Sequence, residues 1–188
     1  MQKRLIRRKK LVIDPKYVLV APPGDDGRYT PLSPDHPVFA LVGRISAAWI
    51  RVEQALDFCI GALADIEDPI TACITAQMMG HAPRCLSIKA LAHWRGLTEV
   101  EEFVATLNNE LFDAADRRNR AIHDKFLVHG LDEKLFKDHR MSKKELHYGL
   151  KEYDYTELNK SISIIEQKLA KCHKLLEMIR DKVYFYEP

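Results

Sequence analysis

Apolar residues in this chain recur at steps of three and four over three long stretches, which is the period of an amphipathic helix. The first stretch, about 37–66, has Val38, Leu41, Ile45, Ala48, Val52, Ala55, Cys59 and Leu63 at these steps. The second begins at Thr98 and has Val100, Val104, Leu107, Leu111 and Ala114. The third begins near 154–156 and has Leu158, Ile162, Ile165, Leu169, Cys172, Leu176, Ile179 and Val183. Alternating steps of four and three are the packing period of helical bundles, so three bundle helices are predicted.

Between the first and second long helices, residues typical of helix ends indicate further boundaries. Asp68-Pro69 is expected to end the first helix. Two shorter helices are predicted at about 70–79 and 83–95, and Gly96 stops the second of them. The segment 98–101, Thr-Glu-Val-Glu, fits a capping box in which the threonine caps a backbone N–H and the second glutamate reaches back.

Two segments lack a helical period. Residues 1–36 contain the run APPGDDGRYTPLSPDHP, which is rich in turn residues and predicts an irregular N-terminal segment. Residues 126–153 combine alternation with aromatics, which favours a short β-hairpin or an extended loop. The predicted fold is therefore all-α. It is an up-and-down bundle of four or five helices over 37–188, with a short hairpin-like insertion before the last helix.

Composition and charge narrow the class of protein only modestly. The chain has 188 residues, 46% of them apolar and 30% charged, which is typical of one globular domain. The net charge of +2 is compatible with nucleic acid without requiring it. The first ten residues, MQKRLIRRKK, favour a solvated basic terminus, with a phosphate-contacting arm as the alternative. No apolar run is long enough for a membrane span. A signal peptide is not expected, because Asp14, Pro15 and Lys16 interrupt the only candidate apolar segment.

Cysteines and histidines give no sign of a metal site. Cys59, Cys73, Cys85 and Cys172 have no C-x-x-C spacing, so they are predicted to be small core residues in a reducing compartment such as the cytoplasm. The eight histidines are scattered without a ligand pattern, so neither a metal nor a cofactor is expected. Trp49 and Trp94 are predicted to be core anchors.

A conflict in the hydrophobic pattern marks the end of the second long helix. Its apolar seam continues after Ala114 to positions 118 and 121, and position 118 is an arginine. A guanidinium cannot lose its charge, so an inward-facing Arg118 needs an anion. Three explanations remain open: a functional anion site, a bundle end that splays and leaves the seam in contact with water, or a structural contact with an internal carboxylate such as Glu53.

The same turn carries a histidine and an amide. Asn119 and His123 are four residues apart and share one helix face, so Asn119 can fix the imidazole tautomer. Asp116 and Arg120 are also four apart, and a surface ion pair is the expected arrangement. A permanent cation beside a titratable base suits RNA cleavage, because the 2′-hydroxyl is an internal nucleophile and no cofactor is required. One histidine cannot easily be both base and acid, which favours two copies in a dimer.

The motif Arg118-Asn119-Arg120-Ala121-Ile122-His123 resembles that of the HEPN superfamily, in which arginine and a polar residue precede a histidine. The segments WIRVEQAL, DKFLVHG and YDYTELNK also resemble bacterial HEPN-type proteins, and the likeness covers about 37–183. The resemblance implies that Arg118 stabilises the transition state, Asn119 orients the site and His123 is the acid or base. It also implies an all-α bundle that dimerises with two motifs facing each other.

Further residues complete the predicted site. Glu53 and Asp116 are expected to support it, and Arg117, Arg120 and Lys125 to contact nucleic acid. The leading hypothesis is a metal-independent, homodimeric RNA endonuclease in the cytoplasm, with a toxin or defence role and an antitoxin-like protein partner. The alternative is a non-catalytic HEPN-like module that binds a protein or nucleic acid. This alternative predicts that a carboxylate holds Arg118 and that His123 is buried.

Overall fold

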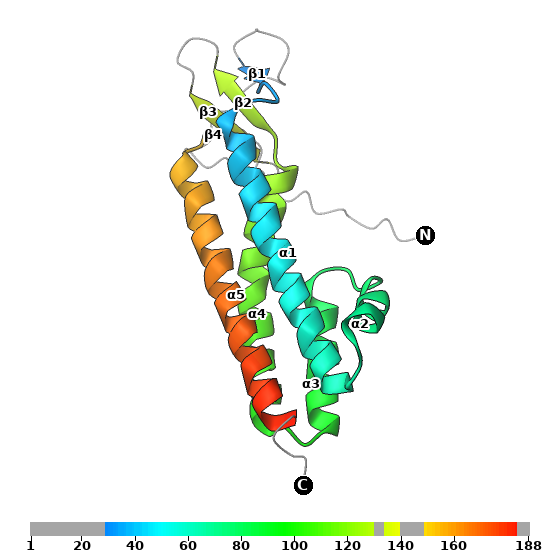
Figure 1. Ribbon diagram of the computed structural model, residues 1–188. Helices are drawn as coiled ribbons and strands as arrows, with labels where there is room; N and C mark the ends of the chain where they lie inside the picture. The colour runs from blue at the N-terminus through cyan, green and yellow to red at the C-terminus, as the bar shows by residue number, and fades with distance from the viewer. Residues whose placement is uncertain (1–28, 130–133, 140–148, 184–188) are drawn as a thin grey trace, which may run out of the picture. The chain divides into compact units, whose positions relative to one another are not determined.

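The computed structural model describes residues 29–129, 134–139 and 149–183, which are mostly helical (Figure 1). The helices in this part of the chain are α1 (Pro37–Ala64), α2 (Asp68–Thr75), α3 (His81–Trp94), α4 (Thr98–His123) and α5 (Tyr155–Val183). The strands are β1 (Tyr29–Pro31), β2 (Phe126–His129), β3 (Leu135–His139) and β4 (Gly149–Glu152). The predicted predominance of helix is confirmed. None of the described helices combines the length and apolarity needed to cross a bilayer.

The chain divides into two compact units. Of the described residues, 37–122 and 156–183 form one, called here the bundle unit, and those within 29–36 and 123–155 form the other, called the sheet unit. Helix α4 therefore ends in the sheet unit with its last residue, His123. Helix α5 begins there with Tyr155 and continues in the bundle unit.

Helices α1, α4 and α5 run side by side in the bundle unit (Figure 1). Lys171 on α5 donates to Glu110 on α4 at 2.6 Å, and Lys182 donates to Glu99 at 2.7 Å, so these two helices are antiparallel. The seam residues fill the core between the helices. Those that are less than a tenth exposed are Val38, Ile45, Ala48, Val52, Ala55, Cys59, Leu63, Val100, Val104, Leu107, Leu111, Ala114, Leu158, Ile162, Ile165, Leu169, Cys172, Leu176 and Ile179. The 4-3 pattern thus identified the buried face of each long helix.

The boundaries of α1 and α2 differ from the prediction. Helix α1 ends at Ala64, where Asp65 has a φ of 57° and the N–H of Ile66 bonds the Gly61 carbonyl at 3.1 Å. These contacts satisfy the last carbonyls of the helix. Asp68-Pro69 therefore begins α2 instead of ending α1, because proline is tolerated in the first turn, where its missing N–H is not needed.

The start of α4 also differs in detail from the predicted capping box. The carbonyl of Leu97 accepts the N–H groups of Val100 and Glu101, both at 3.1 Å. The carboxylate of Glu101 lies 3.2 Å from Nδ1 of His93 on α3. Glu101 therefore links α4 to α3 and does not reach back along its own helix.

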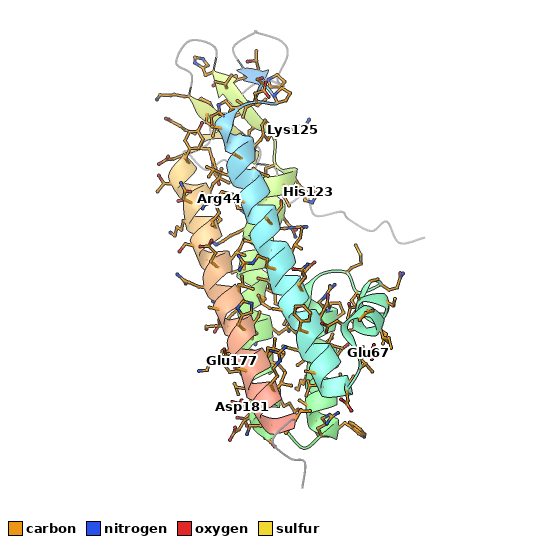
Figure 2. All side chains as sticks on the ribbon, in the orientation of Figure 1. Arg44, Glu67, His123, Lys125, Glu177 and Asp181 are labelled. Carbon is orange, nitrogen blue, oxygen red and sulfur yellow. The ribbon has the colours of Figure 1, made fainter. Side chains whose placement is uncertain are left out.

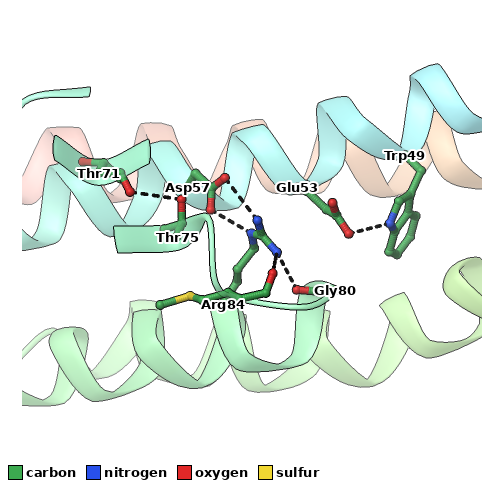
Figure 3. A network of polar contacts seen from close by, with 8 residues as sticks. Trp49, Glu53, Asp57, Thr71, Thr75, Gly80 and Arg84 are labelled. Atoms are coloured by element: carbon green, nitrogen blue, oxygen red, sulfur yellow. Dashed lines mark hydrogen bonds and ion pairs between the residues drawn. The ribbon is translucent and has the colours of Figure 1, made fainter. Parts of the chain in front are cut away.

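Polar contacts of a buried arginine attach α3 and the loop before it to α1 (Figure 3). Arg84 on α3 is only 7% exposed, and its Nε donates to Asp57 on α1 at 2.7 Å. Its Nη1 donates to the carbonyls of Met78 and Gly80 at 2.7 and 2.8 Å. One guanidinium thus holds the loop between α2 and α3 against α1.

The sheet unit contains a four-stranded antiparallel sheet in the order β1-β2-β3-β4. Its pairs include Thr30 with Val128, and Phe126 with Lys137. Leu127, Phe136 and Leu150 form a small core, and Tyr29 packs against it. Residues 29–31 of the predicted irregular segment are thus a strand, and residues 1–28 lie outside the described part.

Most, but not all, of the cysteines and tryptophans predicted for the core are buried. Cys59, Cys85 and Cys172 are buried, and burial raises the pKa of the Cys85 and Cys172 thiols to about 12. Cys73 is exposed on α2, whose buried residues are instead Thr71 and Thr75. Trp49 is 3% exposed, whereas Trp94 is 77% exposed at the end of α3. The predictions for Cys73 and Trp94 were therefore wrong.

Candidate active site

Arg118 interrupts the apolar seam of α4, as the sequence pattern predicts. The seam residues before and after it, Ala114 and Ala121, are buried, and Arg118 itself is partly buried. Its Nη1 donates to Oδ1 of Asn119 at 2.8 Å. Its Nε is buried and has no hydrogen-bond partner among the described residues. A buried donor without an acceptor is costly, so this guanidinium is well suited to receive an anion.

Asn119 orients the arginine through the contact just described. The side chain of Asn119 is exposed on α4, and its carbonyl oxygen is the acceptor for Arg118. Its amide nitrogen can still donate two hydrogen bonds. The two adjacent residues therefore offer several N–H donors on one turn of helix, which is the arrangement that phosphate oxygens require.

His123 is the last residue of α4, and its side chain is exposed (Figure 2). The residue after it is anchored: Oδ2 of Asp124 lies 3.0 Å from Nζ of Lys137 on β3. Lys137 is 7% exposed and also lies over the rings of Phe126 and Tyr153, at 5.7 and 4.8 Å from their centroids. The local sequence pattern does not indicate that this lysine is buried, because a lysine in a predicted hairpin is expected to face solvent.

The predicted supporting acids pair with residues other than Arg118 in the described structure. Oε1 of Glu53 accepts a hydrogen bond from Nε1 of Trp49 at 2.8 Å (Figure 3), so Glu53 is not the counter-ion of Arg118 in the described structure. Asp116 pairs with Nε of Arg120 at 3.0 Å, which is the expected surface pair. Within the described ranges, no three His, Cys, Asp or Glu side chains lie together as metal ligands would.

Two of the three residues predicted to contact nucleic acid form ion pairs with carboxylates. Nε of Arg117 lies 2.9 Å from Asp113, and Arg120 is engaged by Asp116. Lys125, by contrast, is exposed in the link between α4 and β2 (Figure 2). Exposed ion pairs contribute little energy and exchange readily, so a phosphate can displace the carboxylates at low salt.

Sequence reasoning missed a buried histidine in the bundle unit. His81, the first residue of α3, is 5% exposed and packs edge to face against Trp49 on α1 and Phe112 on α4. Its Nε2 has no hydrogen-bond partner among the described residues. Burial lowers the pKa of His81 below its usual value, and the nearby Glu53 carboxylate offsets part of that effect.

His81 is expected to make folding sensitive to mild acid. Because its pKa is depressed in the folded state, the unfolded chain takes up the proton first as the pH falls through 6.5. The free energy of unfolding should therefore fall between pH 7.5 and 5.5, and should fall less in His81→Phe, which keeps an aromatic contact without titrating. Urea unfolding of both proteins at the two pH values measures this difference. Equal pH dependence in the two proteins would contradict it.

Comparisons with known proteins add no relative. A scan of protein-family models and searches of curated proteins and of solved structures find no match to this chain. Any function proposed for this protein therefore depends on its residues and on their arrangement.

Proposed function

We propose that this protein is a HEPN-type RNA endonuclease that acts as a homodimer without a metal. The observation that carries the proposal is Arg118, a cation on an otherwise apolar seam whose buried Nε has no acceptor among the residues that the structure describes. A cytoplasmic location and a toxin or defence role, with an antitoxin-like partner, belong to the same proposal. The role and the partner follow from the resemblance of the motif, and the location follows from cysteines without disulfide or metal spacing.

The proposed reaction is transfer within the RNA strand. A base removes the proton of the 2′-hydroxyl, and this oxygen forms a bond to the adjacent phosphorus. The bond from phosphorus to the 5′-oxygen breaks, and an acid protonates the leaving oxygen. The products are a 2′,3′-cyclic phosphate and a 5′-hydroxyl. Arg118 would hold the non-bridging oxygens as their charge grows, and His123 would carry one of the two protons.

A dimer supplies the second histidine that this reaction needs. One imidazole cannot be protonated for the leaving group and neutral for the nucleophile at the same moment. Two motifs that face each other provide one His123 in each state. The resemblance to HEPN proteins supports this arrangement.

Two observations favour the enzyme over the non-catalytic binding module. The module requires Arg118 to be held by an internal carboxylate, but its contact in the described structure is with the neutral Asn119. It also requires a buried His123, whose side chain is exposed. The test is incubation of the purified protein with mixed RNA in EDTA. Fragments ending in cyclic phosphate and 5′-hydroxyl are expected, whereas intact RNA would favour the binding module.

A further inference from the structure

Helix α3 covers only part of one face of α4. The two helices are antiparallel, because His93 near the end of α3 contacts Glu101, and His81 at its start contacts Phe112. Since His81 is the first residue of α3 and contacts Phe112, α3 covers this face of α4 no further than Phe112. The part of this face that continues toward the end of α4 is not covered by α3.

Phe112 lies on the same face of α4 as part of the candidate site. Residues 112, 116 and 119 follow one another at steps of four and three, so they share a helix face. Seven residues of helix place Phe112 about 10 Å from Asn119 along the axis. Neighbouring nucleotides of one RNA strand can bridge such a separation.

One side of the Phe112 ring packs against a buried aromatic side chain. It is 47% exposed, yet it packs edge to face on His81, with ring centroids 4.7 Å apart and an interplanar angle of 80°. His81 in turn packs at 90° against Trp49, which is 3% exposed. Single exposed apolar side chains are common on surfaces. This one differs because it packs on the buried ring of His81, which packs in turn on Trp49, and because α3 does not cover the helix face beside it.

We infer that Phe112 is a stacking platform for a base of single-stranded RNA whose phosphate is held at Arg118 and Asn119. This inference rests on the proposed function and names its substrate class. Bases stack on exposed aromatic rings without strong sequence preference, and single strands offer unstacked bases that a duplex does not. Asp116 lies between the two contact points, and its pair with Arg120 at 3.0 Å reduces its repulsion of the strand.

The experiment measures binding in full-length His123→Ala protein, in which cleavage is expected to be too slow to interfere. A short, fluorescein-labelled single-stranded RNA of mixed sequence is titrated with this protein and with versions that also carry Phe112→Ala, Phe112→Leu or Phe112→Tyr. Alanine and leucine should weaken binding about tenfold, and tyrosine should preserve it, because only an aromatic ring stacks. Leu86→Ala removes another exposed apolar side chain, 63% exposed on α3, and should leave the affinity unchanged. Duplex RNA should bind all these proteins alike.

Two outcomes would overturn the inference. One is equal affinity of the alanine and parent proteins for single-stranded RNA. The other is loss of self-association in Phe112→Ala, measured by sedimentation, which would make Phe112 a contact with a second copy. Binding is measured apart from cleavage, so the two proposals can fail separately. Binding that depends on Phe112 without any cleavage by wild type would refute only the endonuclease.

Discussion

Replacing His123 by alanine is expected to lower the rate of RNA cleavage by about 10²- to 10⁴-fold, because a positioned acid or base contributes that much. Arg118→Ala should cost about 10²- to 10³-fold, the usual loss when one donor to a developing oxyanion is removed. The reason in this protein is that Nη1 of Arg118 is already oriented by Asn119 at 2.8 Å. Single-turnover rates with labelled RNA measure both losses.

Matched controls separate these losses from a general effect on folding. His173→Ala and Arg180→Ala remove exposed residues of the same types from α5. Lys182 on α5 meets Glu99 at the start of α4, so Arg180 lies several turns from Arg118. Both controls should cut RNA as wild type does. Arg118→Lys keeps the charge but loses the planar donor pair, so partial activity is expected. Full activity in Arg118→Ala would remove the arginine from the mechanism.

Asp57→Ala should destabilise the fold by about 3 kcal/mol, because it leaves the charge of Arg84 buried without a counter-ion. The side chain of Arg84 is 8% exposed and that of Asp57 22%, so water replaces the carboxylate poorly. The contacts of Arg84 with the Met78 and Gly80 carbonyls would remain but would not neutralise it (Figure 3). Urea unfolding followed by circular dichroism measures the change.

An exposed ion pair provides the comparison for this variant. Asp113→Ala removes the partner of Arg117 on α4, where the side chains are 64% and 30% exposed. Such a pair contributes about 0 to 1 kcal/mol. The double variant Asp57→Leu, Arg84→Met should recover stability relative to Asp57→Ala, since no buried charge remains. If Asp57→Ala cost no more than Asp113→Ala, Arg84 would not be the buried clamp described above.

The long helices could be predicted because their information is local. Steps of four and three in α1, α4 and α5 place the apolar residues on one face, and that face has to be buried somewhere. Gly96 ends α3 as expected, since its φ of 70° suits glycine, and the N–H of Leu97 bonds the Ala92 carbonyl at 2.9 Å. Such signals do not depend on which helices are neighbours.

The short elements could not be predicted as well, because their burial depends on tertiary packing. Helix α2 buries Thr71 and Thr75 and exposes Ile70 and Ile74, the reverse of what composition favours. The hydroxyl of Thr71 bonds the Glu67 carbonyl at 3.2 Å, so it can be buried without loss. Gly61 leaves space for the Thr71 side chain, because a Cβ at position 61 would lie only 2.7 Å from Oγ1 of Thr71. Nothing in the local pattern indicates this close contact.

The positions of the candidate residues near the end of α4 could be predicted from the sequence, but their contacts could not. The seam conflict identified Arg118 from sequence alone, since one charged residue broke a regular apolar series. The partner of Asn119 was not predicted: a shared helix face suggested His123, whereas its carbonyl oxygen accepts from Arg118. The exposure of Phe112 was not predicted. It depends on where α3 begins, and the spacing of apolar residues within α4 carries no information about that.

The most direct test of the central claim compares two strands of the same sequence, one of RNA and one of DNA, incubated with wild-type protein in EDTA. We expect the RNA to be cut to cyclic phosphate and 5′-hydroxyl ends while the DNA stays intact, because only ribose carries the internal nucleophile. Cleavage of the DNA strand would rule out the proposed mechanism, since the 2′-hydroxyl could not then be the attacking group.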